Sequence, residues 1–233
     1  MKKTAAAVIS VSMLMTSAAY AADFNDTTNH WARNEISILS DKGIVNGVGA
    51  GWFDPDGEVT RAQYLKMVMQ AVGIPTVEYR AGECLDASAN DWFGPYLQSA
   101  LDKGLIPQEM VAGYKGIVEI ERNEAGEAIA SKVKYSGAFN GGISISREEA
   151  AYLTMSLCQY TLNASTMTKL DMNVDNYSFR DDADISAWTL SAVKLAAANG
   201  IINGMENGDF DPAGTTTRAQ AAVMINRLIN KLG

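Results

Sequence analysis

Three arginines stand at the same place in a short motif that the chain repeats. The letters TRAQ occupy positions 60–63 and again 217–220, and SREE occupies 146–149. Arginine binds carboxylates through two parallel N–H bonds, and free backbone N–H groups at a helix N-terminus also attract anions. A cation in the first helical turn otherwise opposes the helix dipole. The motif therefore predicts anion binding, with a surface arginine paired to a nearby Asp as the alternative. The arginines are Arg61, Arg147 and Arg218.

The first and fourth letters of the same motif predict the start of a helix. A Thr or Ser followed three residues later by Gln or Glu is a capping box, in which each side chain bonds to the other residue's backbone N–H. We therefore expect a helix to begin at each copy. The expected boxes are Thr60 with Gln63, Ser146 with Glu149, and Thr217 with Gln220.

A longer repeat surrounds the motif. One shift without gaps places Trp31 on Trp188 and Gly47 on Gly204, together with the first TRAQ on the second. A middle copy containing Trp92 aligns once an insertion within 108–142 is allowed. Each copy reads as helix, loop, helix, because apolar residues recur at helical spacing on both sides of a turn-rich loop. The first helix of each copy ends at a glycine suited to a left-handed C-terminal cap. These glycines are Gly43, Gly104 and Gly200.

The first 21 residues, MKKTAAAVISVSMLMTSAAYA, have the pattern of a secretory signal peptide. Two lysines precede a short apolar run, and a small-x-small site follows it. The run is too short to span a bilayer, and no later segment is long enough. The sequence thus predicts an exported protein without a membrane span. Its expected organisation is a signal peptide at 1–21 and repeat units at 22–78, 79–165 and 166–233.

Composition excludes some classes of protein. The formal net charge is −8, and removal of the signal peptide with its two lysines would make it about −10. Such an acidic chain without a basic run is not expected to bind nucleic acid. Two cysteines do not make a disulfide scaffold, although a single bridge stays open. Cys158 lies at an apolar helical phase and is expected to be buried, whereas Cys84 precedes Leu85, the expected first apolar anchor of the middle unit.

Metal and catalytic sites are not expected. His30 is the only histidine, so neither a histidine metal pair nor a Ser/His relay can form. We expect it to be exposed just before the first helix. The stretch DPDGE at 54–58 suggests a calcium loop, but Leu65 stands where an EF-hand needs Glu. We therefore predict a protein that is not an enzyme and has no cofactor.

The insertion has the pattern of a β-hairpin. Apolar residues at 117–120 precede NEAGE, and further apolar residues at 128–135 follow it, so two strands joined by a Gly-containing turn are expected. The hairpin is either a surface elaboration or a ribbon that binds a protein partner.

Taken in order, the pattern F-x-D…W…G-I-x-G…F-x-P-x-x-x-(T/S)-R-A-(E/Q) resembles the S-layer homology (SLH) module, in three tandem copies. The resemblance implies a mainly α fold. Three helix–loop–helix repeats would form a pseudo-threefold, three-prong bundle, with the small β-hairpin inserted in the middle repeat.

The resemblance also implies a function. SLH triplets tether exported proteins to the bacterial cell surface by binding secondary cell-wall polysaccharide, typically pyruvylated, in grooves between prongs. The middle copy lacks the G-x-I-x-G loop and has Pro107 where the others have Asn, so its groove is not expected to bind in the same way. The alternative is a surface-layer assembly or protein-binding module that uses the insertion. The residues implied at the grooves are Arg61, Arg147, Arg218, Trp31, Trp92, Trp188, Gly47 and Gly204.

Overall fold

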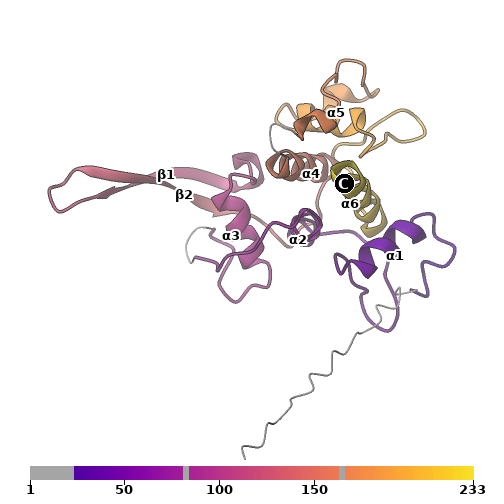
Figure 1. Ribbon diagram of the computed structural model, residues 1–233, viewed down its shortest axis with the longest axis horizontal. Helices are drawn as coiled ribbons and strands as arrows, with labels where there is room; N and C mark the ends of the chain where they lie inside the picture. Colours follow the sequence, from indigo (N-terminus) through magenta and orange to yellow (C-terminus); the bar gives the residue numbers. More distant parts are fainter. Residues whose placement is uncertain (1–23, 81–83, 163–165) are drawn as a thin grey trace, which may run out of the picture.

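The computed structural model describes residues 24–80, 84–162 and 166–233, so the predicted signal peptide lies outside the described residues. The described chain is mainly helical, as the sequence predicts, and is drawn in Figure 1. None of its helices is long and apolar enough to cross a membrane. The α-helices are α1 (Arg33–Asp41), α2 (Arg61–Val72), α3 (Gly94–Asp102), α4 (Arg147–Thr161), α5 (Leu190–Ala198) and α6 (Arg218–Leu232). Short 3-10 turns are η1 (Gln108–Met110), η2 (Met167–Lys169) and η3 (Asp182–Asp184).

Helices α2, α4 and α6 begin at the motif arginines, and the three predicted capping boxes are confirmed. In α2, the backbone N–H of Gln63 donates to the Thr60 hydroxyl at 3.3 Å, and the Gln63 side chain accepts from the Thr60 N–H at 3.0 Å. Each box satisfies N–H groups that a helix start would otherwise leave without partners. The motif thus fixes where each central helix starts.

The three helices pack against one another at the centre of the body (Figure 1). Tyr64 of α2, fully buried, makes a 2.6 Å hydrogen bond with the hydroxyl of Thr154 on α4. The other helices lie outside this centre, with α3 against α2, α5 against α4 and α1 against α6. Helices α3 and α5 therefore pack on the central helix that precedes each of them in the chain, and α1 packs on the last helix.

The segments just before the three central helices are joined by a closed set of backbone hydrogen bonds. Val59 N–H donates to the Thr216 carbonyl at 3.0 Å, Thr216 N–H to the Ile145 carbonyl at 3.0 Å, and Ile145 N–H to the Val59 carbonyl at 2.9 Å. All three residues are fully buried. Within the described chain, the Thr216 hydroxyl has no hydrogen-bond partner. This ring fixes the starts of α2, α4 and α6 relative to one another.

The outer helices end as the glycines predict. Gly43, Gly104 and Gly200 have φ of 68°, 66° and 66°, the left-handed conformation that glycine adopts without steric cost. After α1, the N–H groups of Gly43 and Ile44 donate to the carbonyls of Ser40 and Leu39, which is the Schellman pattern. The chain therefore turns sharply from each outer helix into its loop.

The predicted hairpin is confirmed. Strands β1 (Ala112–Arg122) and β2 (Ala128–Ala138) pair in antiparallel register, with Val118 opposite Val133. Gly126 in the connecting turn has φ of 82°. The hairpin projects away from the helical body (Figure 1). Ile120 and Ile129, with exposed fractions of 49% and 64%, remain open to solvent.

The expected apolar anchor of the middle unit is not confirmed. Leu85 is 77% exposed, so its predicted role as apolar anchor is wrong. Cys84 is buried instead and bonds through its backbone to the Tyr79 hydroxyl. Cys158 is fully buried as predicted, and burial raises the pKa of its thiol to about 11, against the opposing charge of Lys231. Within the described residues, neither cysteine forms a disulfide.

The expectation for His30 is also wrong. Its side chain is only 12% exposed, because the ring turns back onto the start of α1. There Nδ1 accepts the N–H of Ala32 at 3.2 Å, and the ring lies against Trp31 with centroids 5.3 Å apart. His30 thus packs just before α1, beside the exposed Trp31 that precedes this helix.

Candidate functional site: two grooves between helices

Each motif arginine reaches across to the loop of a different repeat unit. Arg218 at the start of α6 donates from Nε to the Phe53 carbonyl and from Nη2 to the Asn46 carbonyl, both at 2.7 Å. Arg147 at the start of α4 donates likewise to the carbonyls of Phe210 at 2.8 Å and Asn203 at 3.3 Å. The arginines therefore join segments that are distant in sequence, a role that the sequence did not reveal.

An aspartate holds the same loop from the other side. Asp26 accepts the N–H groups of Phe53 at 2.9 Å and Asp54 at 2.6 Å. Asp181 accepts in the same way from Phe210 and Asp211, both at 2.7 Å. Burial would raise the pKa of Asp26, but the bonds from Phe53 and Asp54 and the nearby Arg218 lower it below its usual value. The recurring Asp of the F-x-D pattern was the signal for this anchor.

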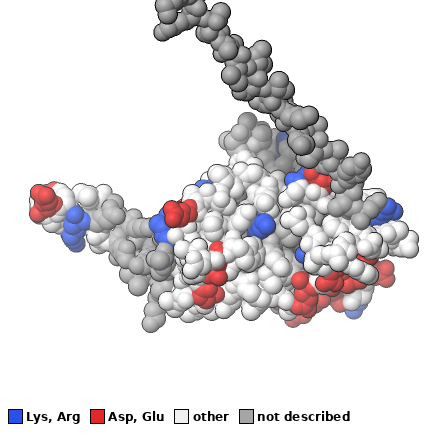
Figure 2. All heavy atoms as spheres, turned by 90° about the horizontal axis from the view of Figure 1, so that it is seen from below, with Lys and Arg blue, Asp and Glu red and all other residues white. Residues whose placement is uncertain are grey.

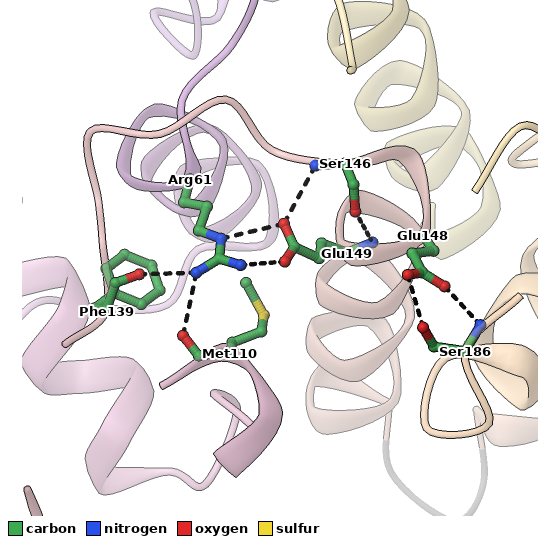
Figure 3. Close-up of polar contacts among 7 residues, drawn as sticks. All are labelled: Arg61, Met110, Phe139, Ser146, Glu148, Glu149 and Ser186. Atoms are coloured by element: carbon green, nitrogen blue, oxygen red, sulfur yellow. Dashed lines mark hydrogen bonds and ion pairs between the residues drawn. The ribbon is translucent and has the colours of Figure 1, made fainter. Parts of the chain in front are cut away.

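All three guanidinium nitrogens of Arg61 have hydrogen-bond partners. Nε and Nη2 donate to the two carboxylate oxygens of Glu149, and Nη1 donates to the carbonyls of Met110 and Phe139 at 3.3 and 3.1 Å, as Figure 3 shows. The side chains of Arg61 and Glu149 are 11% and 12% exposed. A buried bidentate pair of this kind is structural in geometry. The surface-pair alternative for this arginine was right about the pairing, although the partner is a Glu and the pair is not on the surface.

Arg147 and Arg218 differ from Arg61 in one respect. Among the described residues, Nη1 of each has no hydrogen-bond partner. The two guanidinium groups lie over the rings of Phe210 and Phe53, 5.1 and 4.3 Å from the centroids. Burial lowers the pKa of both arginines, opposed by nearby aspartates, yet an arginine remains protonated in proteins. Each therefore offers a fixed cationic donor to a ligand.

Arg218 lines a cavity of about 470 Å³, which we call the Trp92 groove. One wall is the loop after α1, the floor is α2, and the indole of Trp92 at the start of α3 stands opposite with 54% of its surface exposed. A Cβ at Gly47 would lie 2.6 Å from the Trp52 carbonyl, so only glycine allows this close loop. The full lining is Ile44, Val45, Asn46, Gly47, Val48, Gln63, Lys66, Met67, Trp92 and Arg218.

Arg147 lines a second cavity of about 200 Å³, which we call the Trp31 groove. It lies between the loop after α5, helix α6 and the Trp31 indole, which is 65% exposed. The residues match those of the Trp92 groove by position, with Gly204 for Gly47 and Gln220 for Gln63. The remaining lining residues are Ile201, Ile202, Asn203, Met205, Phe210, Val223, Met224 and Arg227.

At the third equivalent place, which we call the Trp188 junction, the matching residues contact other side chains of the described chain. Trp188 is only partly exposed and packs against Tyr152 of α4, with ring centroids 5.1 Å apart. Glu148 accepts from the backbone and hydroxyl of Ser186, both at 2.9 Å, and from the Thr189 hydroxyl at 2.8 Å (Figure 3). These bonds tie the N-terminal end of α5 to α4. The structure thus brings six of the eight predicted groove residues into two grooves, whereas Arg61 pairs with Glu149 and Trp188 packs against Tyr152.

The face drawn in Figure 2 shows lysine and arginine singly, whereas acidic side chains gather along one edge of the helical body. This distribution agrees with the acidic composition. An anion would therefore be attracted only locally, at the guanidinium groups described above.

The S-layer homology domain family matches residues 23–65 and 178–222. The chain therefore contains S-layer homology domains in its first and last thirds. The matches end inside α2 and α6, just after each TRAQ motif.

Relatives extend the likeness to most of the chain. An amylopullulanase of Thermoanaerobacterium thermosulfurigenes is 31% identical over 219 residues, which cover 92% of this chain and 10% of the relative. An exoglucanase of Acetivibrio thermocellus is 29% identical over 208 residues, covering 89% and 16%. The surface-layer 125 kDa protein of Lysinibacillus sphaericus is 24% identical over 235 residues, covering 98% and 16%.

The chain thus spans between about a tenth and a sixth of the length of these relatives. Two are named as enzymes and one as a surface-layer protein, so what they share with this chain is a limited segment of each. Such domains in surface-layer and cell-surface proteins are consistent with anchoring to the cell envelope.

Proposed function

We propose that this protein binds an anionic, pyruvylated cell-wall polysaccharide without transforming it, and so anchors itself at the surface of a bacterium after export. The observation that carries the proposal is the pairing, in two grooves, of an exposed indole with a guanidinium that keeps one nitrogen unpartnered among the described residues. An indole face stacks on a sugar ring, and an arginine donor suits the carboxylate of a pyruvyl substituent.

We also propose that units 22–78, 79–165 and 166–233 are three S-layer homology repeats in a pseudo-threefold, three-prong arrangement. The cyclic packing of α1 on α6, α3 on α2 and α5 on α4 supports this, as does the closed ring of bonds at Val59, Ile145 and Thr216. Each prong would be an outer helix with its loop.

Different residues within each groove contribute to the proposed binding in different ways. The loop glycines Gly47 and Gly204 let the loop beside each groove close tightly, since a Cβ at either would lie 2.6 or 3.0 Å from a loop carbonyl. Gln63 and Gln220 line the grooves beside the arginines and add uncharged polar groups. Because the arginines are already held by loop carbonyls, little ordering is needed when a ligand arrives, which favours affinity.

The Trp188 junction would not bind the glycan. Glu149 occupies two nitrogens of Arg61, and Tyr152 covers Trp188, so both binding groups are engaged within the protein. This agrees with the expectation from the missing middle loop.

Co-sedimentation of the mature protein with purified sacculi tests the proposal. Replacing Trp31 and Trp92 together with Ala should move the protein from the pellet to the supernatant, because each groove loses its stacking surface. Both tryptophans are more than half exposed, so the fold should persist, and circular dichroism would check this. Arginine variants are less suitable because Arg147 and Arg218 also hold loops.

Tyr160→Ala is the matched control, since Tyr160 is an aromatic residue with half its surface exposed that lines neither groove. It should sediment like the wild type. A folded Trp31/Trp92 double variant that still sediments fully would show that the grooves do not hold the wall.

A second candidate function is binding of a protein partner by the hairpin, which its projection from the body and the exposed Ile120 and Ile129 favour. Lys115 and Ser136 are partners in the ladder, so the hairpin can be shortened by joining them through Asn-Gly, a favoured two-residue turn. Under the main proposal this variant sediments normally. Loss of sedimentation would favour the hairpin instead.

A further inference from the structure

One position on the central helices differs among the three junctions in a systematic way. It lies six residues after the capping Thr or Ser, and each residue there belongs to the junction of one tryptophan. The three residues are Lys66 for Trp92, Tyr152 for Trp188 and Val223 for Trp31.

Lys66 places a positive charge at the indole of the Trp92 groove. Its Nζ lies 5.8 Å from the centroid of the Trp92 ring, and the side chain is half-buried. Within the described part of the chain, Lys66 forms no ion pair. The Trp92 groove therefore has two cationic donors from different helices, Lys66 on α2 and Nη1 of Arg218 on α6.

Val223 makes the same place apolar in the Trp31 groove. Its neighbours Met205 and Met224 add to an apolar lining, and the cavity is smaller. Arg227 also lines this groove, but it lies about one turn further along α6. Its Nη1 approaches the Ile201 carbonyl at 3.5 Å. No second charge therefore stands at the position that Lys66 holds in the Trp92 groove.

We propose that this position determines which part of the glycan each groove takes. With Lys66, the Trp92 groove takes a segment with two acidic groups, one of them on the sugar stacked against the indole. With Val223, the Trp31 groove takes an acidic group bound by Arg147 and, against the indole, an uncharged sugar bearing an apolar substituent. With Tyr152, the indole of Trp188 is covered. The inference rests on the proposed glycan binding and adds the ligand class of each groove.

The test isolates each groove and titrates it with polysaccharide released from sacculi, either native or with its carboxyl groups reduced to alcohols. The Trp31→Ala background leaves the Trp92 groove, and the Trp92→Ala background leaves the Trp31 groove. In the Trp31→Ala background, Lys66→Val should weaken binding of the native glycan about fivefold, the effect of losing one partly exposed charge pair. Binding of the reduced glycan should not change, and Lys66→Arg should restore binding of the native one.

Lys103→Val is the matched control, because Lys103 also lies 5.8 Å from an aromatic centroid, that of Tyr160, outside both grooves. It should bind like its parent. Carboxyl reduction should also weaken the Trp92 groove more than the Trp31 groove. Equal weakening, or a folded Lys66→Val variant with unchanged affinity for the native glycan, would overturn the inference.

The outcomes separate the inference from the function on which it rests. If the Trp31→Ala/Trp92→Ala double variant binds the native glycan as the wild type does, the proposed function fails, and the inference fails with it. If the double variant loses binding while Lys66→Val changes nothing, the grooves bind glycan but this position does not select it.

Discussion

Asp26 and Arg218 hold the two polar backbone groups of one residue, Phe53. The Asp26 carboxylate accepts the Phe53 N–H at 2.9 Å, and Arg218 Nε donates to the Phe53 carbonyl at 2.7 Å. The aspartate comes from the start of the described chain and the arginine from its last helix. A single residue of the first loop is thus fixed by both ends of the fold.

Replacing Arg218 with Lys should destabilise the protein even though the charge remains. Lysine has a single nitrogen and cannot reach both the Phe53 and Asn46 carbonyls in the planar geometry of a guanidinium. Loss of one charge-assisted bond predicts a decrease of about 1.5–3 kcal/mol in the free energy of unfolding. Denaturant unfolding checks this. Arg227→Lys, at the 3.5 Å contact, is the comparison and should cost clearly less.

Replacing Thr216 with Val should stabilise the protein. The hydroxyl is fully buried and has no partner among the described residues, while Val59 occupies the equivalent place in the ring. Removing an unsatisfied buried hydroxyl predicts a gain of about 1 kcal/mol in the free energy of unfolding. The reverse change, Val59→Thr, should cost a similar amount. A stabilising Val59→Thr would contradict this explanation.

Replacing Glu149 with Gln should separate its two roles. Gln closes the capping box at the other two central helices, so α4 should keep its start. The charge pair with Arg61 is lost from a site only 12% exposed, which predicts a decrease of about 1–3 kcal/mol in stability. A double-mutant cycle with Arg61→Gln measures the coupling directly. A coupling near zero would mean that the pair contributes nothing.

Acid should weaken the loop anchors made by Asp26 and Asp181. Backbone N–H groups and an arginine lower the pKa of Asp26 and of Asp181, although burial acts in the opposite direction. A carboxyl with a lower pKa in the folded state stabilises above its unfolded pKa, near 3.9, and this stability is lost as the pH falls through the folded value. Unfolding free energies between about pH 2 and 6 should therefore decrease below about pH 4.

The Asp26→Asn/Asp181→Asn double variant is the control for this acid dependence. It should be less stable at neutral pH and show a smaller decrease in acid, because two of the titrating carboxyls are gone. If its decrease below about pH 4 matches that of the wild type, other carboxyls account for the acid sensitivity.

Much of the local structure could be predicted because it depends on neighbours in sequence. Capping boxes, glycine C-caps and the hairpin follow from residues a few positions apart, as at Thr60 and Gln63 or at Gly43. For the candidate site, the repeat aligns Trp31, Trp92, Gly47 and Gly204 with equivalent residues, and the resemblance to the S-layer homology module implies that they lie at grooves.

What could not be predicted depends on contacts between units. The guanidinium nitrogens of Arg61 are occupied because Glu149 and the Met110 carbonyl, which are far away in sequence, lie close to it. The proposed role of Lys66 depends on the packing of α2 beside Trp92, which lies further along the chain. Periodicity gives the face of a helix that is buried, but not the helix that covers it.

The Trp92 groove takes its loop and floor from residues 44–67, its indole from Trp92 and its guanidinium from Arg218. The Trp31 groove likewise combines Trp31, Arg147 and the loop after α5. Each proposed binding site therefore combines residues from the beginning, the middle and the end of the chain. Under the proposed function, a chain cut back to its first or its last copy would therefore lack part of both grooves.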